Sequence, residues 1–239
     1  MKSKKPAIIL VRPQLPENIG MVARAMNNFD FKDLNLVNPR IKWPNKISFQ
    51  ASKNAKLITK NTKVFNSLSN ALEKYNFVIA TTNRKRFLEK KYIKSFESLN
   101  KFINLNKNSA IIFGPENSGL SNQDLRLADY LFTINTSKNN NSLNLSHAVS
   151  IVIHNINEYF LNNNYRKITK DLDLNLSSKK NLLFFLKYLI EELEKSNFFY
   201  PPTKKQNMID NIYALFLKAS LTTKEVNTLW GMIKKLRKH

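Results

Sequence analysis

One apolar run followed by two closely spaced glycines constrains this chain more than any other stretch. Residues 110–113 read Ala-Ile-Ile-Phe, and Gly114, Pro115 and Gly119 come soon after them. The run fits a buried β-strand, and Pro115 stops further pairing within a sheet. The whole chain holds only four glycines, so two of them this close together after one strand predict a loop whose backbone must be free of side chains.

The order strand, loop and helix around these glycines predicts where a ligand would bind. Ser121 can cap a helix that begins at residue 122. A parallel strand that delivers a glycine-containing loop at its carboxyl end is where open α/β sheets hold their ligands. Because short motifs also match by chance, an ordinary strand-to-helix turn is the alternative interpretation.

Short apolar runs alternate with helical patterns over the first two thirds of the chain. Alternation of this kind predicts an α/β fold with a mostly parallel sheet. The apolar runs predict strands at residues 7–11, 34–37, 77–80, 110–113 and 130–134. Helical spacing of apolar residues predicts helices at 18–28, 49–58 and 68–75, and a long helix through residues 148–160 into which residues 142–146 lead. Residues 90–107 show no clear pattern.

The last third of the chain has a purely helical period. Apolar stripes that begin near residues 182, 208 and 226 predict three helices, and residues 162–180, which are polar, predict a linker. Thr222 and Glu225 have the spacing of a capping box, and Thr203 and Gln206 have the same spacing. We therefore expect an α/β domain over residues 1–161, a linker over 162–180 and a small helical domain over 181–239.

The charge balance points to a polyanionic partner. The formal net charge is +22, from 39 Lys and Arg against 17 Asp and Glu. Such an excess favours nucleic acid, although charge alone does not distinguish RNA from DNA. A compositional bias towards Lys and Asn, as an AT-rich genome would encode, is the alternative explanation.

Several classes of protein are excluded or disfavoured by what the sequence lacks. There is no cysteine, which excludes disulfides and thiolate chemistry and fits a reducing compartment. No apolar run has the length of a membrane span, and the basic start is not followed by a signal peptide, so we expect a soluble cytoplasmic protein. His147 and His154 lack partners at ligand spacing, so no metal site is expected. The motifs of nucleotide hydrolases, dinucleotide-binding domains and α/β-hydrolases do not occur.

Three stretches in order carry a resemblance to a known family. Residues 18–26 read Asn-Ile-Gly-Met-Val-Ala-Arg-Ala-Met, residues 113–120 read Phe-Gly-Pro-Glu-Asn-Ser-Gly-Leu, and residues 142–149 read Ser-Leu-Asn-Leu-Ser-His-Ala-Val. This ordered set resembles the three motifs of the SPOUT-class RNA 2′-O-ribose methyltransferases, over roughly residues 5–161. Residues 221–231 resemble the helical tail of bacterial tRNA (cytidine/uridine-2′-O)-methyltransferases that act at nucleotide 32 in the anticodon loop.

The resemblance implies a fold and a cofactor. The α/β domain would carry a trefoil knot in its C-terminal part, which ordinary rules of chain connection make rare. The protein would be a homodimer that binds S-adenosylmethionine in the knotted loops. The cofactor-binding residues implied are Ala80, Thr81, Thr82, Gly114, Ile134, Ser142, Leu143 and Asn144.

The resemblance also implies catalytic residues. Arg24 would orient the phosphate next to a ribose 2′-hydroxyl and lower the pKa of that hydroxyl, or would itself act as the base. Because a guanidinium is effectively always protonated, electrostatic activation is the favoured role. Asn18, Glu116, Ser142 and Asn144 would order the site through hydrogen bonds.

RNA is the substrate that this family implies, and tRNA is the substrate implied by the tail. Arg12, Arg84, Lys85 and Arg86 lie in loops that follow predicted strands, and we expect them to contact RNA phosphates. Two alternatives remain: the same methylation of ribosomal RNA, and a catalytically silent RNA-binding protein that keeps only the basic surface. A silent protein is disfavoured because the whole set of expected catalytic residues is intact: Asn18, Arg24, Glu116, Ser142 and Asn144.

Overall fold

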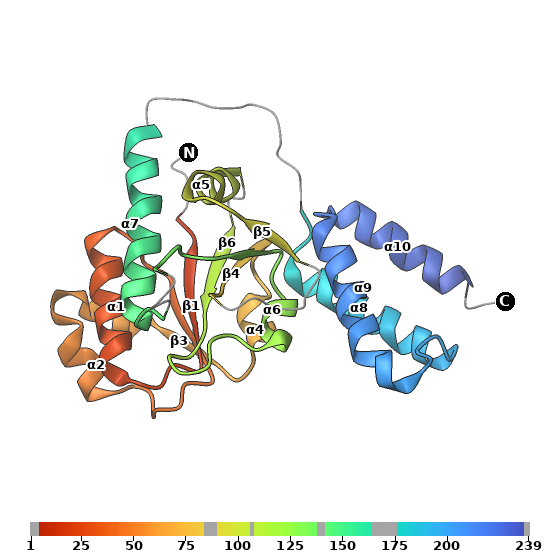
Figure 1. Ribbon diagram of the computed structural model, residues 1–239, viewed down its shortest axis with the longest axis horizontal. Coiled ribbons are helices and arrows are strands. Elements are labelled where there is room, and N and C mark those ends of the chain that lie inside the picture. The colour runs from red at the N-terminus through yellow and green to blue at the C-terminus, as the bar shows by residue number, and fades with distance from the viewer. Residues whose placement is uncertain (1–4, 84–89, 106–107, 138–141, 164–175, 237–239) are drawn as a thin grey trace.

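The computed structural model of the protein describes residues 5–83, 90–105, 108–137, 142–163 and 176–236. Within these ranges, seven strands form one sheet, and every neighbouring pair is parallel (Figure 1). The order across the sheet is β3-β2-β1-β6-β4-β7-β5. The strands are β1 (Ala7–Val11), β2 (Leu34–Val37), β3 (Lys63–Phe65), β4 (Phe77–Thr81), β5 (Lys91–Ile93), β6 (Ser109–Phe113) and β7 (Tyr130–Phe132).

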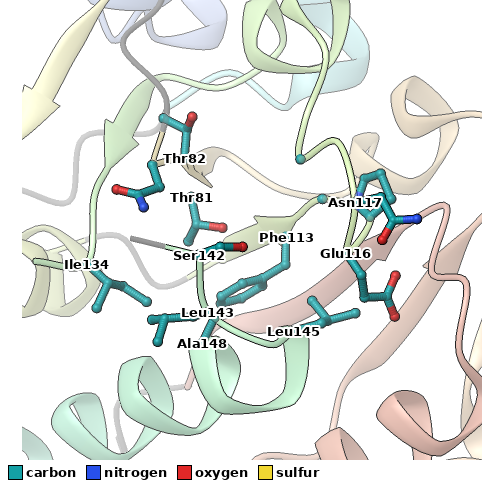
Figure 2. A pocket seen from close by; sticks show the side chains of 14 residues that line it. Thr81, Thr82, Phe113, Glu116, Asn117, Ile134, Ser142, Leu143, Leu145 and Ala148 are labelled. Atoms are coloured by element: carbon teal, nitrogen blue, oxygen red, sulfur yellow. The ribbon is translucent and has the colours of Figure 1, made fainter. Parts of the chain in front are cut away.

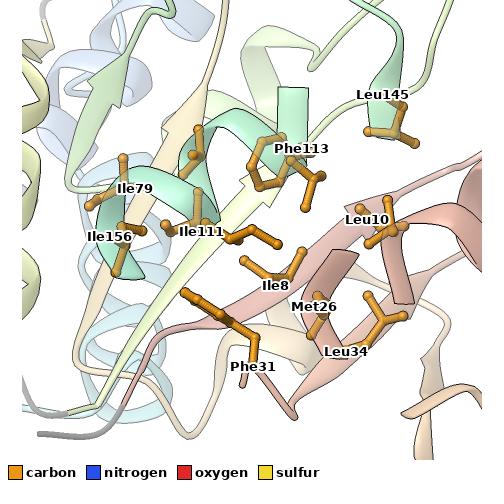
Figure 3. Packing of buried hydrophobic residues seen from close by; sticks show 14 of the residues in the cluster. Ile8, Leu10, Met26, Phe31, Leu34, Ile79, Ile111, Phe113, Leu145 and Ile156 are labelled. Atoms are coloured by element: carbon orange, nitrogen blue, oxygen red, sulfur yellow. The ribbon is translucent and has the colours of Figure 1, made fainter. Parts of the chain in front are cut away.

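The central strands are apolar along their whole length because both faces of the sheet are covered. Ile8 of β1 and Ile111 of β6 point to the face covered by α1 (Pro16–Asn28), α5 (Phe96–Leu105) and α7 (Leu145–Asn163), where Figure 3 shows the core. Their neighbours Ile9 and Ile112 point to the opposite face. That face is covered by the short helices α4 (Leu68–Leu72) and α6 (Asn122–Arg126).

The predicted strands and the long helices are confirmed, but several predicted boundaries are wrong, and the strands β3 and β5 and the helix α5 were not predicted. The helix predicted at 49–58 is interrupted: α2 (Lys46–Ala51) and α3 (Lys56–Asn61) are separated by Lys53, whose φ of 50° lies in the left-handed region. Residues 90–107, which show no clear pattern, hold β5 and α5. The strand predicted at 130–134 ends at Phe132.

Three helices follow residue 176 and share an apolar core of their own. They are α8 (Lys179–Lys195), α9 (Lys205–Lys218) and α10 (Thr223–Leu236). Phe185 and Leu186 of α8, Leu217 of α9 and Val226 of α10 are buried together. The three predicted apolar stripes are therefore the faces that these helices turn toward one another. None of the helices in the ranges given above is long and apolar enough to cross a membrane.

Buried and half-buried ion pairs attach these helices to the sheet. Lys179 at the start of α8 is almost fully buried and donates to Asp129, which also accepts from the backbone N–H of Val78 at 2.6 Å. Arg126 of α6 pairs with Asp210 of α9 at 3.1 Å. The pair of Lys179 and Asp129 lies at the amino ends of the strands. The helices are therefore anchored at the end of the sheet that is opposite to the strands' carboxyl ends.

Only one of the two predicted capping boxes forms. The two threonines concerned, Thr222 and Thr203, therefore allow a substitution at a cap to be compared with the same substitution where no cap exists. The Thr222 hydroxyl accepts from the backbone N–H of Glu225 at 3.3 Å, and the Glu225 carboxylate accepts from the backbone N–H of Thr222 at 2.8 Å. The expected second box is wrong, because α9 begins after Lys204 without a side-chain cap. We expect Thr222→Ala to lower the free energy of unfolding by about 1 kcal/mol, since an N-cap is lost.

Urea unfolding followed by circular dichroism measures this effect. Thr203→Ala is the control, because it removes the same hydroxyl from a position where the structure shows no cap, and its unfolding midpoint should match that of the unaltered protein. Equal destabilisation by the two substitutions would contradict the assignment of the cap to Thr222.

Candidate functional site

A cavity of about 660 Å³ lies at the carboxyl ends of β4, β6 and β7, beside the start of α7. Figure 2 shows Ile134 and Leu143 towards one end of the cavity, and Glu116 and Asn117 towards the other. The volume is within the usual range of small-molecule sites, and the position is where open α/β sheets hold their ligands. The lining residues are Thr81, Thr82, Asn83, Phe113, Gly114, Pro115, Glu116, Asn117, Gly119, Ile134, Ser142, Leu143, Leu145 and Ala148.

Most of the residues expected to bind a cofactor lie around this cavity. Six of the eight line it: Thr81, Thr82, Gly114, Ile134, Ser142 and Leu143. Ala80 and Asn144 are not among the lining residues. Ala80 is fully buried on the face of the sheet that α4 and α6 cover, and Asn144 hydrogen-bonds to other side chains. The cavity is also lined by Leu145 and Ala148, which were not among the residues expected to bind the cofactor although they follow Asn144 closely in the chain.

The geometry explains why position 114 is a glycine. A Cβ atom placed on Gly114 would lie 2.3 Å from the backbone nitrogen of Leu120 and 2.5 Å from the carbonyl carbon of Gly119. The loop of residues 114–120 therefore folds back onto its own first residue. Gly119 has a φ of +66°, a conformation that side chains disfavour. The two glycines allow the loop to close on itself, and this closed loop forms part of the cavity wall.

A hydrogen-bonded chain joins residues from all three sequence motifs. Asn144 Nδ2 donates to Asn18 Oδ1 at 3.1 Å, and Asn18 Nδ2 donates to Glu116 Oε1 at 2.8 Å. Glu116 also accepts from the backbone N–H groups of Gln14 at 3.0 Å and Leu15 at 3.4 Å. The carboxylate of Glu116 thus fixes the loop before α1, the first turn of α1 and, through Asn18, the segment before α7.

Asn18 and Asn144 have local roles that the sequence did not separate. Asn18 does not cap a helix, because α1 begins at Pro16 after Leu15 and Asn18 is buried within its first turn. Asn144 is the residue that caps a helix: its Oδ1 accepts from the backbone N–H of Ser146 at 2.8 Å at the start of α7. Asn144 therefore ties the start of α7 to Asn18, and hence to Glu116.

Arg24 and Ser142, the other two expected catalytic residues, lie in different surroundings. Ser142 lines the cavity. Arg24 is exposed on α1, does not line the cavity, and has no hydrogen bond or ion pair within the part of the chain that the structure describes. Six residues along a helix correspond to about 240° of rotation, so Arg24 points away from the side of α1 on which Asn18 meets Glu116.

Arg12 lies against an acidic side chain of the protein itself. Its guanidinium forms a two-pronged pair with Asp124, with Nη1 to Oδ1 at 3.1 Å. Burial alone would raise the pKa of Asp124, but hydrogen bonds from Arg12 and Ser121 outweigh it and hold that pKa below its ordinary value. Because Asp124 also caps α6 together with Ser121, Arg12 holds the helix that follows the glycine loop. Arg84, Lys85 and Arg86 lie outside the described residues.

Ionisable side chains are sparse at the cavity, where Glu116 is the lining residue that carries a charge. Over the described ranges, no group of three or more His, Cys, Asp or Glu side chains is placed to hold a metal ion. The lining combines apolar side chains, hydroxyl groups and loop backbone. Such a surface suits an uncharged aromatic ring with polar edges, together with a ribose and a short polar chain.

Comparison with known proteins identifies the relatives of this chain. The sequence profile of the SpoU rRNA Methylase family matches residues 5–154. The tRNA (cytidine-2′-O-)-methyltransferase TrmJ of Methanocaldococcus jannaschii is 29% identical over 232 residues, which cover 95% of this chain and 98% of that protein. The tRNA (cytidine/uridine-2′-O-)-methyltransferase TrmJ of Pectobacterium atrosepticum is 28% identical over 233 residues, covering 97% of this chain and 96% of that protein.

A solved structure extends the likeness to the whole length of the fold. The crystal structure of TrmJ from Z. mobilis ZM4 matches with a TM-score of 0.87 and 33% sequence identity. The match covers 97% of this chain and 99% of that one. It therefore includes the helices after residue 176 as well as the sheet.

Proposed function

The chain belongs to the SpoU rRNA Methylase family and is an RNA methyltransferase, and we propose that its substrate is cytidine or uridine at position 32 of tRNA, methylated on the ribose 2′-hydroxyl. One observation carries the proposal: the chain of hydrogen bonds from Glu116 through Asn18 to Asn144 joins the three motifs at one cavity. The two TrmJ relatives described above match over nearly the full length and are named for tRNA, which supports tRNA as the substrate. A further full-length relative, from Haemophilus influenzae, is named as an uncharacterised tRNA/rRNA methyltransferase. Methylation of tRNA is consistent with a cytoplasmic location.

S-adenosylmethionine is the cofactor, and the cavity fits it. Its size and its mixture of apolar and hydroxyl-bearing side chains suit an adenosine with an amino-acid chain. Ile134 and Leu143 would pack against the faces of the adenine, and the loop backbone at Gly114 would read its edge. Thr81, Thr82 and Ser142 offer hydroxyls to the polar groups. The cofactor supplies an electrophilic methyl group when it is bound.

The reaction needs a ribose hydroxyl that loses its proton as the methyl group is transferred. A guanidinium beside the adjacent phosphate favours the developing alkoxide electrostatically, and Arg24 is the residue to which we assign this role. Glu116 and Asn18 keep the first turn of α1 in place relative to the glycine loop, and Asn144 does the same for the start of α7.

A homodimer brings Arg24 to a cofactor site. Met21 and Arg24 are three residues apart on α1 and share a face of that helix, where Met21 is 41% exposed. Ile151 on the adjacent helix α7 is 38% exposed. We assign these two helices to the contact between protomers, so that Arg24 of each protomer points into the cavity of its partner.

Two features of the architecture also belong to the proposal. The later strands are inserted among the earlier ones, with β6 between β1 and β4, and β7 between β4 and β5. Such insertion supports a chain that is threaded as a trefoil knot between β6 and α7. The separate core of α8–α10 supports a distinct helical domain after the linker.

Methyl transfer to defined RNAs tests the proposed function. The purified protein is incubated with labelled S-adenosylmethionine and either an unmodified tRNA transcript or ribosomal RNA, and nuclease fragments are analysed by mass spectrometry. We expect one 2′-O-methylated nucleotide, at position 32 of the tRNA. Methylation of the ribosomal RNA alone would overturn the assigned substrate, and tRNA binding without methylation would identify a silent RNA-binding protein.

A further inference from the structure

A long stretch on one side of the sheet carries positive charge without any negative charge. Residues 34–72 contain seven Lys and Arg but no Asp or Glu. One of the seven, Lys63, lies on the edge strand β3, where a lysine also prevents pairing with another chain. We call residues 40–60 the basic segment; its cations are Arg40, Lys42, Lys46, Lys53, Lys56 and Lys60.

Alternating side chains hold the first part of the basic segment in place. Ile41 and Trp43 pack against the main core cluster, and the Trp43 ring also stacks on Phe49 with centroids 6.2 Å apart. Arg40 and Lys42 alternate with them and are exposed. The two apolar side chains thus pack inward, while the two cations that alternate with them face solvent.

Close packing against α1 holds the second part. A Cβ atom on Gly20 would lie 2.4 Å from the carbonyl oxygen of Ser48 in α2, so the two helices approach more closely than side chains allow. The Ser48 hydroxyl donates to the carbonyl of Pro16 at 2.8 Å. Lys46, like the cations of α3, stays exposed. Within the described residues, none of the six cations of the basic segment pairs with a carboxylate.

The basic segment begins at the carboxyl ends of the strands, which is also where the cavity lies. The backbone N–H of Arg40 donates to the carbonyl of Pro13 at 3.1 Å. One residue further, the N–H of Gln14 donates to Glu116, which lines the cavity. Figure 1 shows α2 beside the start of α1, at the end of the molecule where the strands end. These two contacts therefore connect the start of the basic segment with a residue that lines the cavity.

We propose that the basic segment binds the phosphate backbone of the substrate RNA next to the nucleotide that enters the cavity. The inference rests on the proposed function and adds to it a surface on the α/β domain that holds the substrate. Unpaired cations on a fixed scaffold suit a polyanion with regularly spaced charges, because each contact releases counterions without costing an internal ion pair. The segment gives affinity and orientation rather than base specificity.

Two triple variants with the same change of charge test the assignment. The first combines Arg40→Gln, Lys42→Gln and Lys46→Gln, the cations nearest the cavity. The control combines Lys101→Gln, Lys180→Gln and Lys195→Gln, which lie elsewhere and face Glu97, Glu73 and Glu192. Binding to an unmodified tRNA transcript is measured over a range of salt concentrations, and binding of S-adenosylmethionine is measured for each protein.

We expect the first variant to lose tRNA affinity by on the order of tenfold for each cation that contacts a phosphate at about 0.1 M salt. The slope of log affinity against log salt should become shallower by about two to three. Cofactor binding should be unchanged in both variants. Equal losses in the two variants, or unchanged affinity in the first, would overturn the assignment of the basic segment while methylation of tRNA by the unaltered protein leaves the proposed function standing. A protein that neither binds nor methylates tRNA overturns both.

Discussion

Gly114→Val is expected to abolish binding of S-adenosylmethionine while the sheet stays folded. Any side chain at this position collides with the backbone of residues 119–120, less than 3 Å away. Backbone cannot move aside as the end of a flexible side chain can, so the loop must open. Gly114, Pro115, Glu116 and Asn117 all line the cavity, and an opened loop would deform the wall that holds the cofactor.

Calorimetric titration with S-adenosylmethionine measures this effect, with circular dichroism as the test of folding. Gly231→Val makes the same substitution where no atom lies within 4 Å of the added Cβ, and it should bind the cofactor normally. Unchanged affinity in a folded Gly114→Val protein would remove the glycine loop from the cofactor site.

Arg24→Ala is expected to reduce turnover by about two to three orders of magnitude, the usual cost of removing one electrostatic stabiliser of the transition state. Cofactor affinity should change little, because the role assigned to Arg24 is towards the RNA phosphate and the ribose hydroxyl and not towards the cofactor. Losing a contact that forms only in the transition state lowers kcat, so single-turnover methylation of tRNA is the measurement. Methylation near the level of the unaltered protein would exclude Arg24 from the reaction.

Mixing two inactive variants tests whether the site is shared between protomers. A dimer of one Arg24→Ala chain with one Gly114→Val chain keeps one cavity that is intact and faces an intact Arg24, so part of the activity should return. Each variant mixed with itself is the control. Inactive mixed dimers, with exchange of subunits verified by mass, would place Arg24 and the cavity that it serves within one chain.

The centre of the sheet was predictable, and its edge was not. Residues 7–11 and 110–113 are apolar throughout because they are buried on both faces, and such runs are the plainest signal of a parallel strand. The edge strand β5 pairs with a single neighbour, and of its three residues only Ile93 is buried. A strand this short and exposed has no periodic pattern of apolar residues. The basic residues around it also make the apolar pattern of α5 hard to recognise in the sequence.

The sequence predicted which segments form the candidate site but not how they meet. The three motifs converge as expected, yet the chain of contacts through Asn18 depends on the angle between α1 and the glycine loop, which no local pattern records. Gly114 was correctly placed at the cavity, but the atoms that exclude a side chain are those of its own loop. The side of α1 on which Arg24 lies can be worked out from its spacing to Asn18, but only once the structure shows which side of α1 is buried.

Because of the buried pair of Lys179 and Asp129, the stability of the sheet depends on the helices α8–α10. Replacing Lys179 with an uncharged residue would leave Asp129 as a buried carboxylate without its cation, and breaking such a pair costs about 3–5 kcal/mol. A tail exchanged between relatives would be tolerated only if it brings a lysine to the same point. The attachment of these helices thus depends on ion pairs that lie far from the cavity.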